Sequence, residues 1–262
     1  MGVPIIDMKK KLLITMGCSY TEGVGCWIDE TPHGLKAKSS HEEYSYWYEL
    51  SRDNFHEKGW PNQLGKLMGF DKVINLGMGG ASTSSNVKFW FERYSDEYFD
   101  NYDVTMVWLL PSPYRISFYK NSVLEDELIN EPNSESLSAW LVRSDNSDLD
   151  VQLEQASWVR IMINECKLKN IKLVLFAQLY YNHLIKLVNQ RIYDSELLRL
   201  NRIEEYKSIA CGHLNELGYY KLAEVMYMYI SRTRPDIKIG EKVDDLEWSW
   251  EAEREQIIPK MI

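Results

Sequence analysis

The chain has 262 residues, 45% of them hydrophobic, and a formal net charge of −9 at pH 7. This size and composition suit one large α/β domain with insertions. The acidic balance argues against general binding to nucleic acids or anionic membranes, because phosphate contacts need a clustered positive field. No apolar run approaches the roughly 20 residues of a membrane-spanning helix. Lysines interrupt the apolar start of MGVPIIDMKKKLLIT, so we expect a soluble, cytoplasmic protein without a signal peptide.

The four cysteines give little support for a metal or redox motif. Cys18, Cys26, Cys166 and Cys211 form no CxxC pair, which zinc ribbons and thioredoxin-like sites require. Reduced thiols are the ordinary state in the cytoplasm. We expect no metal site and no organic cofactor.

Short apolar runs alternate with helical patterns along the chain. The predicted strands are residues 11–16, 73–76, 104–110 and 171–178. The predicted helices lie near residues 61–69, 84–99, 151–169, 184–206 and 216–232. Continuous apolar strands separated by helices are typical of a parallel sheet covered on both faces. The sequence therefore predicts a three-layer α/β/α sandwich, with ligands beyond the carboxyl ends of its strands.

Three polar stretches do not fit this alternation. We expect a domain over residues 1–234, with insertions at about 26–59 and 114–150, and a C-terminal extension over 235–262. Long loops in compact domains are usually functional lids or disordered segments. The extension contains the tryptophans of EWSW, which need a surface to bury against. We expect this tail to serve a protein partner or self-association.

Aromatic side chains gather in and beside the first insertion. They could stack on sugar rings or form a packing cluster inside the insertion, and we favour the packing cluster. The residues are Trp27, Tyr44, Tyr46, Trp47, Tyr48 and Trp60.

A serine follows the first predicted strand, and a histidine precedes the last predicted helix. Ser19 lies in LITMGCSYTEG, and His213 lies in IACGHLNELG. A serine hydroxyl needs a base within hydrogen-bond reach to become a nucleophile, and histidine suits that role near neutral pH. Taken singly, each residue could instead have a structural role, as a helix cap or a loop hydrogen-bonding residue.

A glycine-rich segment follows the second predicted strand, in VINLGMGGASTSSNV. Its glycines allow the backbone to approach a ligand closely, and the serines after them favour a helix start that attracts an anion. The oxyanion formed during ester cleavage is such an anion. A tight turn without a ligand is the alternative, and a dinucleotide site is disfavoured because residues 77–82 lack the last glycine of GxGxxG.

The order of these segments resembles the SGNH (GDSL-like) hydrolases. Their pattern has a GxS block, an NxGxxG block and an HxN block, in that order. On this pattern Ser19 matches the nucleophile, Asn75 the asparagine that opens the second block, Gly80 the oxyanion-hole glycine and His213 the base. The chain looks most like phage and environmental-bacterial members, in which GCS replaces GDS. The resemblance implies a flavodoxin-like sheet and hydrolysis of esters, often acyl or acetyl groups on carbohydrates or lipids.

Three positions depart from the family pattern. Cys18 replaces the aspartate of GDSL, and LLPSPYR replaces the segment that supplies an oxyanion-hole asparagine. Ser112 lies near that asparagine's place, and Arg115 could supply positive charge there. Ala210 stands three residues before His213, where the catalytic aspartate is expected.

We therefore expect a serine hydrolase that cleaves a small-molecule or glycan ester through a Ser-His dyad or an atypical triad. The alternative is a catalytically degenerate SGNH fold that serves as a binding or virion-structural module. If the chain is encoded by a phage, the expected location is the host cytoplasm or the virion.

Overall fold

The computed structural model describes residues 9–28, 41–97, 99–112, 115–120, 123–128, 147–178 and 182–232. The described residues up to Ile230 belong to one compact unit. The tail expected over 235–262 lies outside the described residues, and the domain boundary before it stays a prediction.

Five parallel strands form the main sheet. Its order is β2-β1-β3-β6-β7, which is the flavodoxin-like order 2-1-3-4-5. The strands are β1 (Lys10–Gly17), β2 (Lys72–Gly77), β3 (Tyr102–Leu110), β6 (Lys172–Ala177) and β7 (Ile192–Asp194). The predicted parallel α/β/α architecture is confirmed, and all four predicted strands lie in this sheet.

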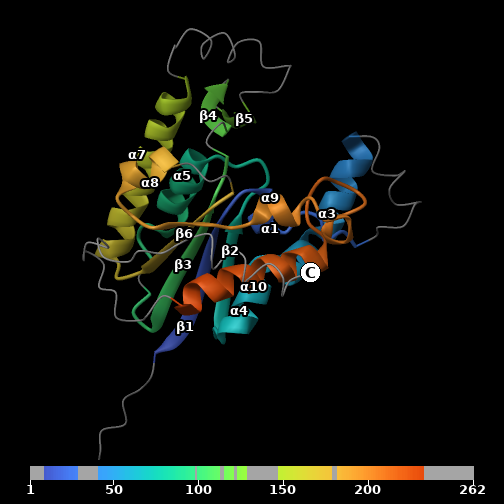
Figure 1. Ribbon diagram of the computed structural model, residues 1–262, viewed down its shortest axis with the longest axis horizontal. Helices are drawn as coiled ribbons and strands as arrows, with labels where there is room; N and C mark the ends of the chain where they lie inside the picture. The colour runs from blue at the N-terminus through green and yellow to red at the C-terminus, as the bar shows by residue number, and fades with distance from the viewer. Residues whose placement is uncertain are drawn as a thin grey trace, which may run out of the picture. The chain divides into compact units, whose positions relative to one another are not determined.

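Helices cover both faces of the sheet (Figure 1). One face packs against α5 (Thr83–Tyr94), α7 (Ser147–Leu168) and α8 (Asn182–Val188). The other face packs against α4 (Trp60–Met68) and α10 (Glu216–Arg232). Helix α4 has a proline in its first turn and ends at Gly69 in the left-handed conformation, so its sequence signals match both of its ends.

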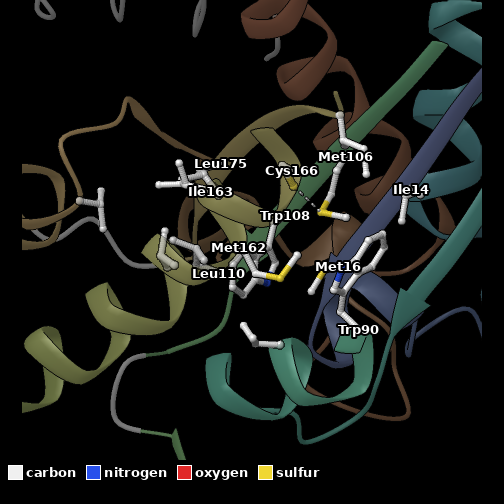
Figure 2. Packing of buried hydrophobic residues seen from close by; sticks show 14 of the residues in the cluster. Ile14, Met16, Trp90, Met106, Trp108, Leu110, Met162, Ile163, Cys166 and Leu175 are labelled. Carbon is white, nitrogen blue, oxygen red and sulfur yellow. Dashed lines mark hydrogen bonds between the residues drawn. The ribbon is translucent and has the colours of Figure 1, made fainter. Parts of the chain in front are cut away.

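Alternate side chains of each strand fill the two cores, as the period of two requires. In β1, Ile14 and Met16 face α5 and α7, whereas Leu13 faces α4 and α10. Figure 2 shows the first of these cores, in which Trp90 and Trp108 pack beside Met16. Both tryptophans are fully buried. This packing fixes the strand ends that carry the site.

The helix predicted near 184–206 is wrong. The segment contains α8, the edge strand β7, the short helix α9 (Leu197–Leu200) and a 3-10 turn (Glu204–Tyr206). Asn189 and Glu196 have positive φ angles of 49° and 56°, which end a right-handed helix. Ser195 then donates its Oγ hydrogen to the Ala177 carbonyl over 2.8 Å, which ties this segment to β6. The helix predicted near 84–99 is also shorter, because α5 ends at Tyr94.

The two expected insertions contain regular structure. The helix α3 (His41–Lys58) lies within the first, and Phe55 on it is fully buried. The Trp27 ring packs edge-on against Phe55 with centroids 5.0 Å apart, so Trp27 belongs to a packing cluster, whereas Tyr46 is exposed. The second contains an antiparallel hairpin, β4 (Arg115–Lys120) and β5 (Val123–Leu128), and the first turn of α7.

Candidate active site

Ser19 is the first residue of the short helix α1 (Ser19–Glu22), directly after β1. The turn is tight, because a Cβ atom on Gly17 would lie 2.1 Å from Thr21 Oγ1. The Thr21 and Glu22 N–H groups both donate to the Cys18 carbonyl, at 2.8 and 3.0 Å. The sequence GCS thus holds Ser19 at the carboxyl edge of the sheet, where the topology places ligands.

His213 lies in a loop that is braced before α10. Ser208 N–H donates to the His213 carbonyl over 2.9 Å, and Asn215 N–H donates to the Tyr206 carbonyl over 2.8 Å. The Asn215 side chain then accepts from Gly218 N–H in the first turn of α10. These bonds bring His213 Nε2 to 2.7 Å from Ser19 Oγ, although 194 positions separate the two residues.

The other ring nitrogen of His213 has no such partner. Its Nδ1 atom is buried and makes no hydrogen bond with the described residues. Ala210, at the place of the family's aspartate, cannot accept a hydrogen bond through its side chain. The Tyr20 ring packs on the imidazole instead, with centroids 4.7 Å apart. Burial, with a smaller effect of the Arg115 charge, lowers the pKa of His213 to about 4.

Asn75 connects the second strand to the serine turn. Its Nδ2 donates to the Thr21 carbonyl over 2.9 Å, and its Oδ1 accepts from Gly77 N–H over 2.9 Å. Gly77 is equally confined, because a Cβ atom there would lie 2.2 Å from Glu22 N. Asn75 therefore links the end of β2 to the backbone of α1.

Gly80 lies where the chain turns from β2 to α5, with φ +80°. Helix α5 then begins with a capping box between Ser82 and Ser85. Within the described ranges, neither Ser19 N–H nor Gly80 N–H donates a hydrogen bond to a backbone carbonyl outside the regular elements. Both donors are therefore available to an oxyanion.

The side chain of Arg115, the first residue of β4, extends to Gly80. A Cβ atom on Gly80 would lie 3.3 Å from Arg115 Nη1. Burial, the largest effect, raises the pKa of the Cys18 thiol, and the Arg115 guanidinium is among the smaller effects that lower it. Ser112 contributes its carbonyl, which accepts from Arg115 N–H over 3.1 Å.

Sequence reasoning missed three neighbours of the site. Tyr20 covers the His213 ring, as described above. Gln178 follows β6, and its Oε1 accepts a long contact of 3.9 Å from Cys18 Sγ. Gln178 ends a predicted strand, and this position could have indicated that it lies near the site. Glu22 is 4% exposed and accepts a hydrogen bond from Tyr48 of α3, a contact that no sequence pattern indicated.

Other kinds of site receive no support from the described residues. All four cysteines are free thiols. In the part of the chain that the structure describes, no cluster of three or more His, Cys, Asp or Glu side chains could hold a metal ion. Nor does any described helix have both the length and the apolar character needed to cross a membrane.

No protein-family model and no curated protein matches the chain. It is similar in structure to a carbohydrate esterase whose active site has divergent catalytic and non-catalytic binding functions. The two proteins are 11% identical and superpose with a TM-score of 0.51, and the match covers 88% of this chain and 71% of the esterase. A GDSL-family lipolytic protein of Desulfitobacterium hafniense is also similar, with 11% identity, a TM-score of 0.44 and coverage of 84% and 99%.

A third similar structure is an acetyl xylan esterase of Butyrivibrio proteoclasticus, with 10% identity, a TM-score of 0.47 and coverage of 88% and 65%. At such identities, the likeness to the carbohydrate esterase bears on the fold alone. Together with the observed strand order, it establishes that this chain has the α/β/α fold of the SGNH (GDSL-like) hydrolases.

Proposed function

We propose that the protein is a serine hydrolase that cleaves an ester of a small molecule or a glycan. The contact of 2.7 Å between Ser19 Oγ and His213 Nε2 carries this proposal. A nucleophile within hydrogen-bond reach of a base is the arrangement that covalent ester cleavage requires. The likeness to a carbohydrate esterase supports a glycan ester as substrate.

The reaction begins when His213 Nε2 takes the proton of Ser19 Oγ as that oxygen attacks the ester carbonyl carbon. The carbonyl oxygen becomes an oxyanion, which accepts hydrogen bonds from Ser19 N–H and Gly80 N–H. As the C–O bond breaks, His213 protonates the leaving alcohol. Water then attacks the acyl-Ser19 ester, with His213 again as base, and releases the acid.

Within the part of the chain that the structure describes, the proposed catalytic dyad lacks a hydrogen-bond acceptor for Nδ1 of His213. In this mechanism Nδ1 carries the imidazole hydrogen, and no acceptor for it lies among the described residues. The missing acceptor favours the alternative proposal, in which the protein is a binding module without catalytic activity. The Ser19–His213 contact counts against this alternative, because a silent site would not need to keep it.

The test is ester hydrolysis by the purified protein. Release of acetate from acetylated xylo-oligosaccharides and from 4-nitrophenyl acetate is measured for the native chain and for Ser19→Ala and His213→Ala. Ser157→Ala is the matched control, because Ser157 is an exposed serine on α7. We expect hydrolysis that both site substitutions abolish and the control retains. Activity that survives Ser19→Ala would overturn the proposal.

A further inference from the structure

The backbone before Arg115 positions this residue beside the proposed oxyanion site. Its N–H donates to the Ser112 carbonyl over 3.1 Å, so the turn after β3 positions the first residue of β4. From there the side chain reaches Gly80, with Nη1 3.3 Å from the position of a Cβ atom on that glycine. The guanidinium therefore lies beside Gly80, the residue whose N–H is proposed to help hold the oxyanion.

The charge of Arg115 is not neutralised by the described part of the chain. The ion pairs there involve other cations, and none includes Arg115. The nearby carboxylate of Glu22 forms no ion pair with Arg115: its Oε2 lies 2.9 Å from the position of a Cβ atom on Gly79, and its Oε1 accepts a hydrogen bond from Tyr48. Arg115 is partly buried, and no described side chain forms an ion pair with it. An anion on a ligand would supply the missing charge.

Two neighbours of Arg115, Cys18 and His213, supply no negative charge. Burial keeps the Cys18 thiol neutral by raising its pKa, and the His213 ring is neutral at pH 7. The oxyanion already has two backbone donors, Ser19 N–H and Gly80 N–H. The planar guanidinium is suited to hold a permanent carboxylate or phosphate through two parallel hydrogen bonds.

We propose that Arg115 binds an anionic group, a carboxylate or a phosphate, that the substrate carries in addition to its reacting ester. This inference rests on the proposed esterase function and narrows its substrate class to anionic esters. Arg115 is then a specificity-determining residue for that reaction.

Three acetyl esters test this inference. They are 4-acetoxybenzoate, 4-acetoxyphenyl phosphate and the neutral methyl 4-acetoxybenzoate, which share the acetyl group and differ in charge. With kcat/KM corrected for the alkaline hydrolysis rate of each ester, we expect one of the anionic esters to exceed the neutral one by about tenfold or more, the size of a charge-assisted hydrogen bond. The anionic ester with the higher kcat/KM shows whether Arg115 binds a carboxylate or a phosphate.

Arg115→Gln should reduce this preference ratio at least tenfold, mainly through KM, and Arg115→Lys should retain part of it. Arg52→Gln is the control, since Arg52 is an exposed member of a surface ion pair on α3. Equal kcat/KM for charged and neutral esters in the native protein would overturn the inference. So would an equal loss for all three esters in Arg115→Gln, because Arg115 would then serve only the oxyanion.

A binding measurement separates this inference from the esterase proposal. Calorimetry of the three esters with Ser19→Ala protein needs no catalysis. Binding of an anionic ester that Arg115→Gln in the same background weakens about tenfold supports the anion site even if the native chain hydrolyses nothing. Equal affinity for charged and neutral esters would exclude the anion site even if the protein is an esterase.

Discussion

Ser19 Oγ lies 2.7 Å from His213 Nε2, while Nδ1 of the same ring is buried without a hydrogen-bond partner among the described residues. The fold therefore brings a nucleophile and a base together but does not orient the base in the usual way. In a serine triad, loss of the orienting acid lowers kcat by about 10⁴. We expect the native chain to be a slow esterase for this reason.

Ala210→Asp should restore the missing acid. The family pattern has the aspartate three residues before the histidine, and Ala210 occupies that place. A carboxylate facing Nδ1 would hold the productive tautomer and stabilise the imidazolium. We expect kcat to rise at least tenfold. Ala210→Asn, which has the same shape without the charge, should give a smaller gain. No gain in a folded Ala210→Asp protein would show that Nδ1 faces elsewhere.

The pH dependence of ester cleavage should reflect the lowered pKa of His213. Burial, and then Arg115, bring it to about 4. A general base acts in its neutral form, so activity should rise with pH through about 4 and be level from about pH 5.5 to 8. The profile of kcat/KM on a neutral ester measures this. An inflection near 6.5, the ordinary histidine value, would contradict the burial of this ring.

Asn75→Ala should disturb the serine turn. The substitution removes the bonds to the Thr21 carbonyl and to Gly77 N–H. Partly buried groups left without partners cost about 1 to 3 kcal/mol. We expect that loss in the free energy of unfolding, measured with urea, together with reduced hydrolysis. Asn62→Ala is the control, because Asn62 makes an exposed bond to the Glu57 carbonyl. Equal effects of both substitutions would refute this role of Asn75.

Gly77→Ala should move the serine turn by steric contact. Its Cβ atom would lie 2.2 Å from Glu22 N and 2.4 Å from the Thr21 carbonyl carbon. Both are backbone atoms, so relief requires α1 to shift, at about 1 to 3 kcal/mol. Gly212→Ala is the control, since nothing lies within 4 Å of its added carbon. Thermal unfolding compares the two, and an unchanged melting temperature for Gly77→Ala would contradict the close packing.

The sequence predicted the central sheet because each long strand is a continuous apolar run between helical patterns. It missed β7 because three residues, Ile192 to Asp194, are too few to show a period. It gave no helix for α3, which is polar along most of its length and is held by a few aromatic contacts such as Trp27 with Phe55.

The candidate site was predictable where residues follow strand ends, as Ser19 and Gly80 do. Tyr20 and Glu22 were not predictable as site neighbours, because their contacts with His213 and Tyr48 join segments far apart in the chain. Such tertiary contacts leave no local pattern. The place of Arg115 likewise depends on the turn between β3 and β4, whose length alone does not fix where the guanidinium lies.

The most direct test of the account is labelling with a fluorophosphonate, a probe that reacts with activated serines. The folded native protein should be labelled at Ser19, as mass spectrometry of the modified peptide would verify. Ser19→Ala and His213→Ala should abolish the label, and Ser157→Ala should retain it. A folded native protein that stays unlabelled at high probe concentration, or a label that persists without His213, would contradict an activated Ser19.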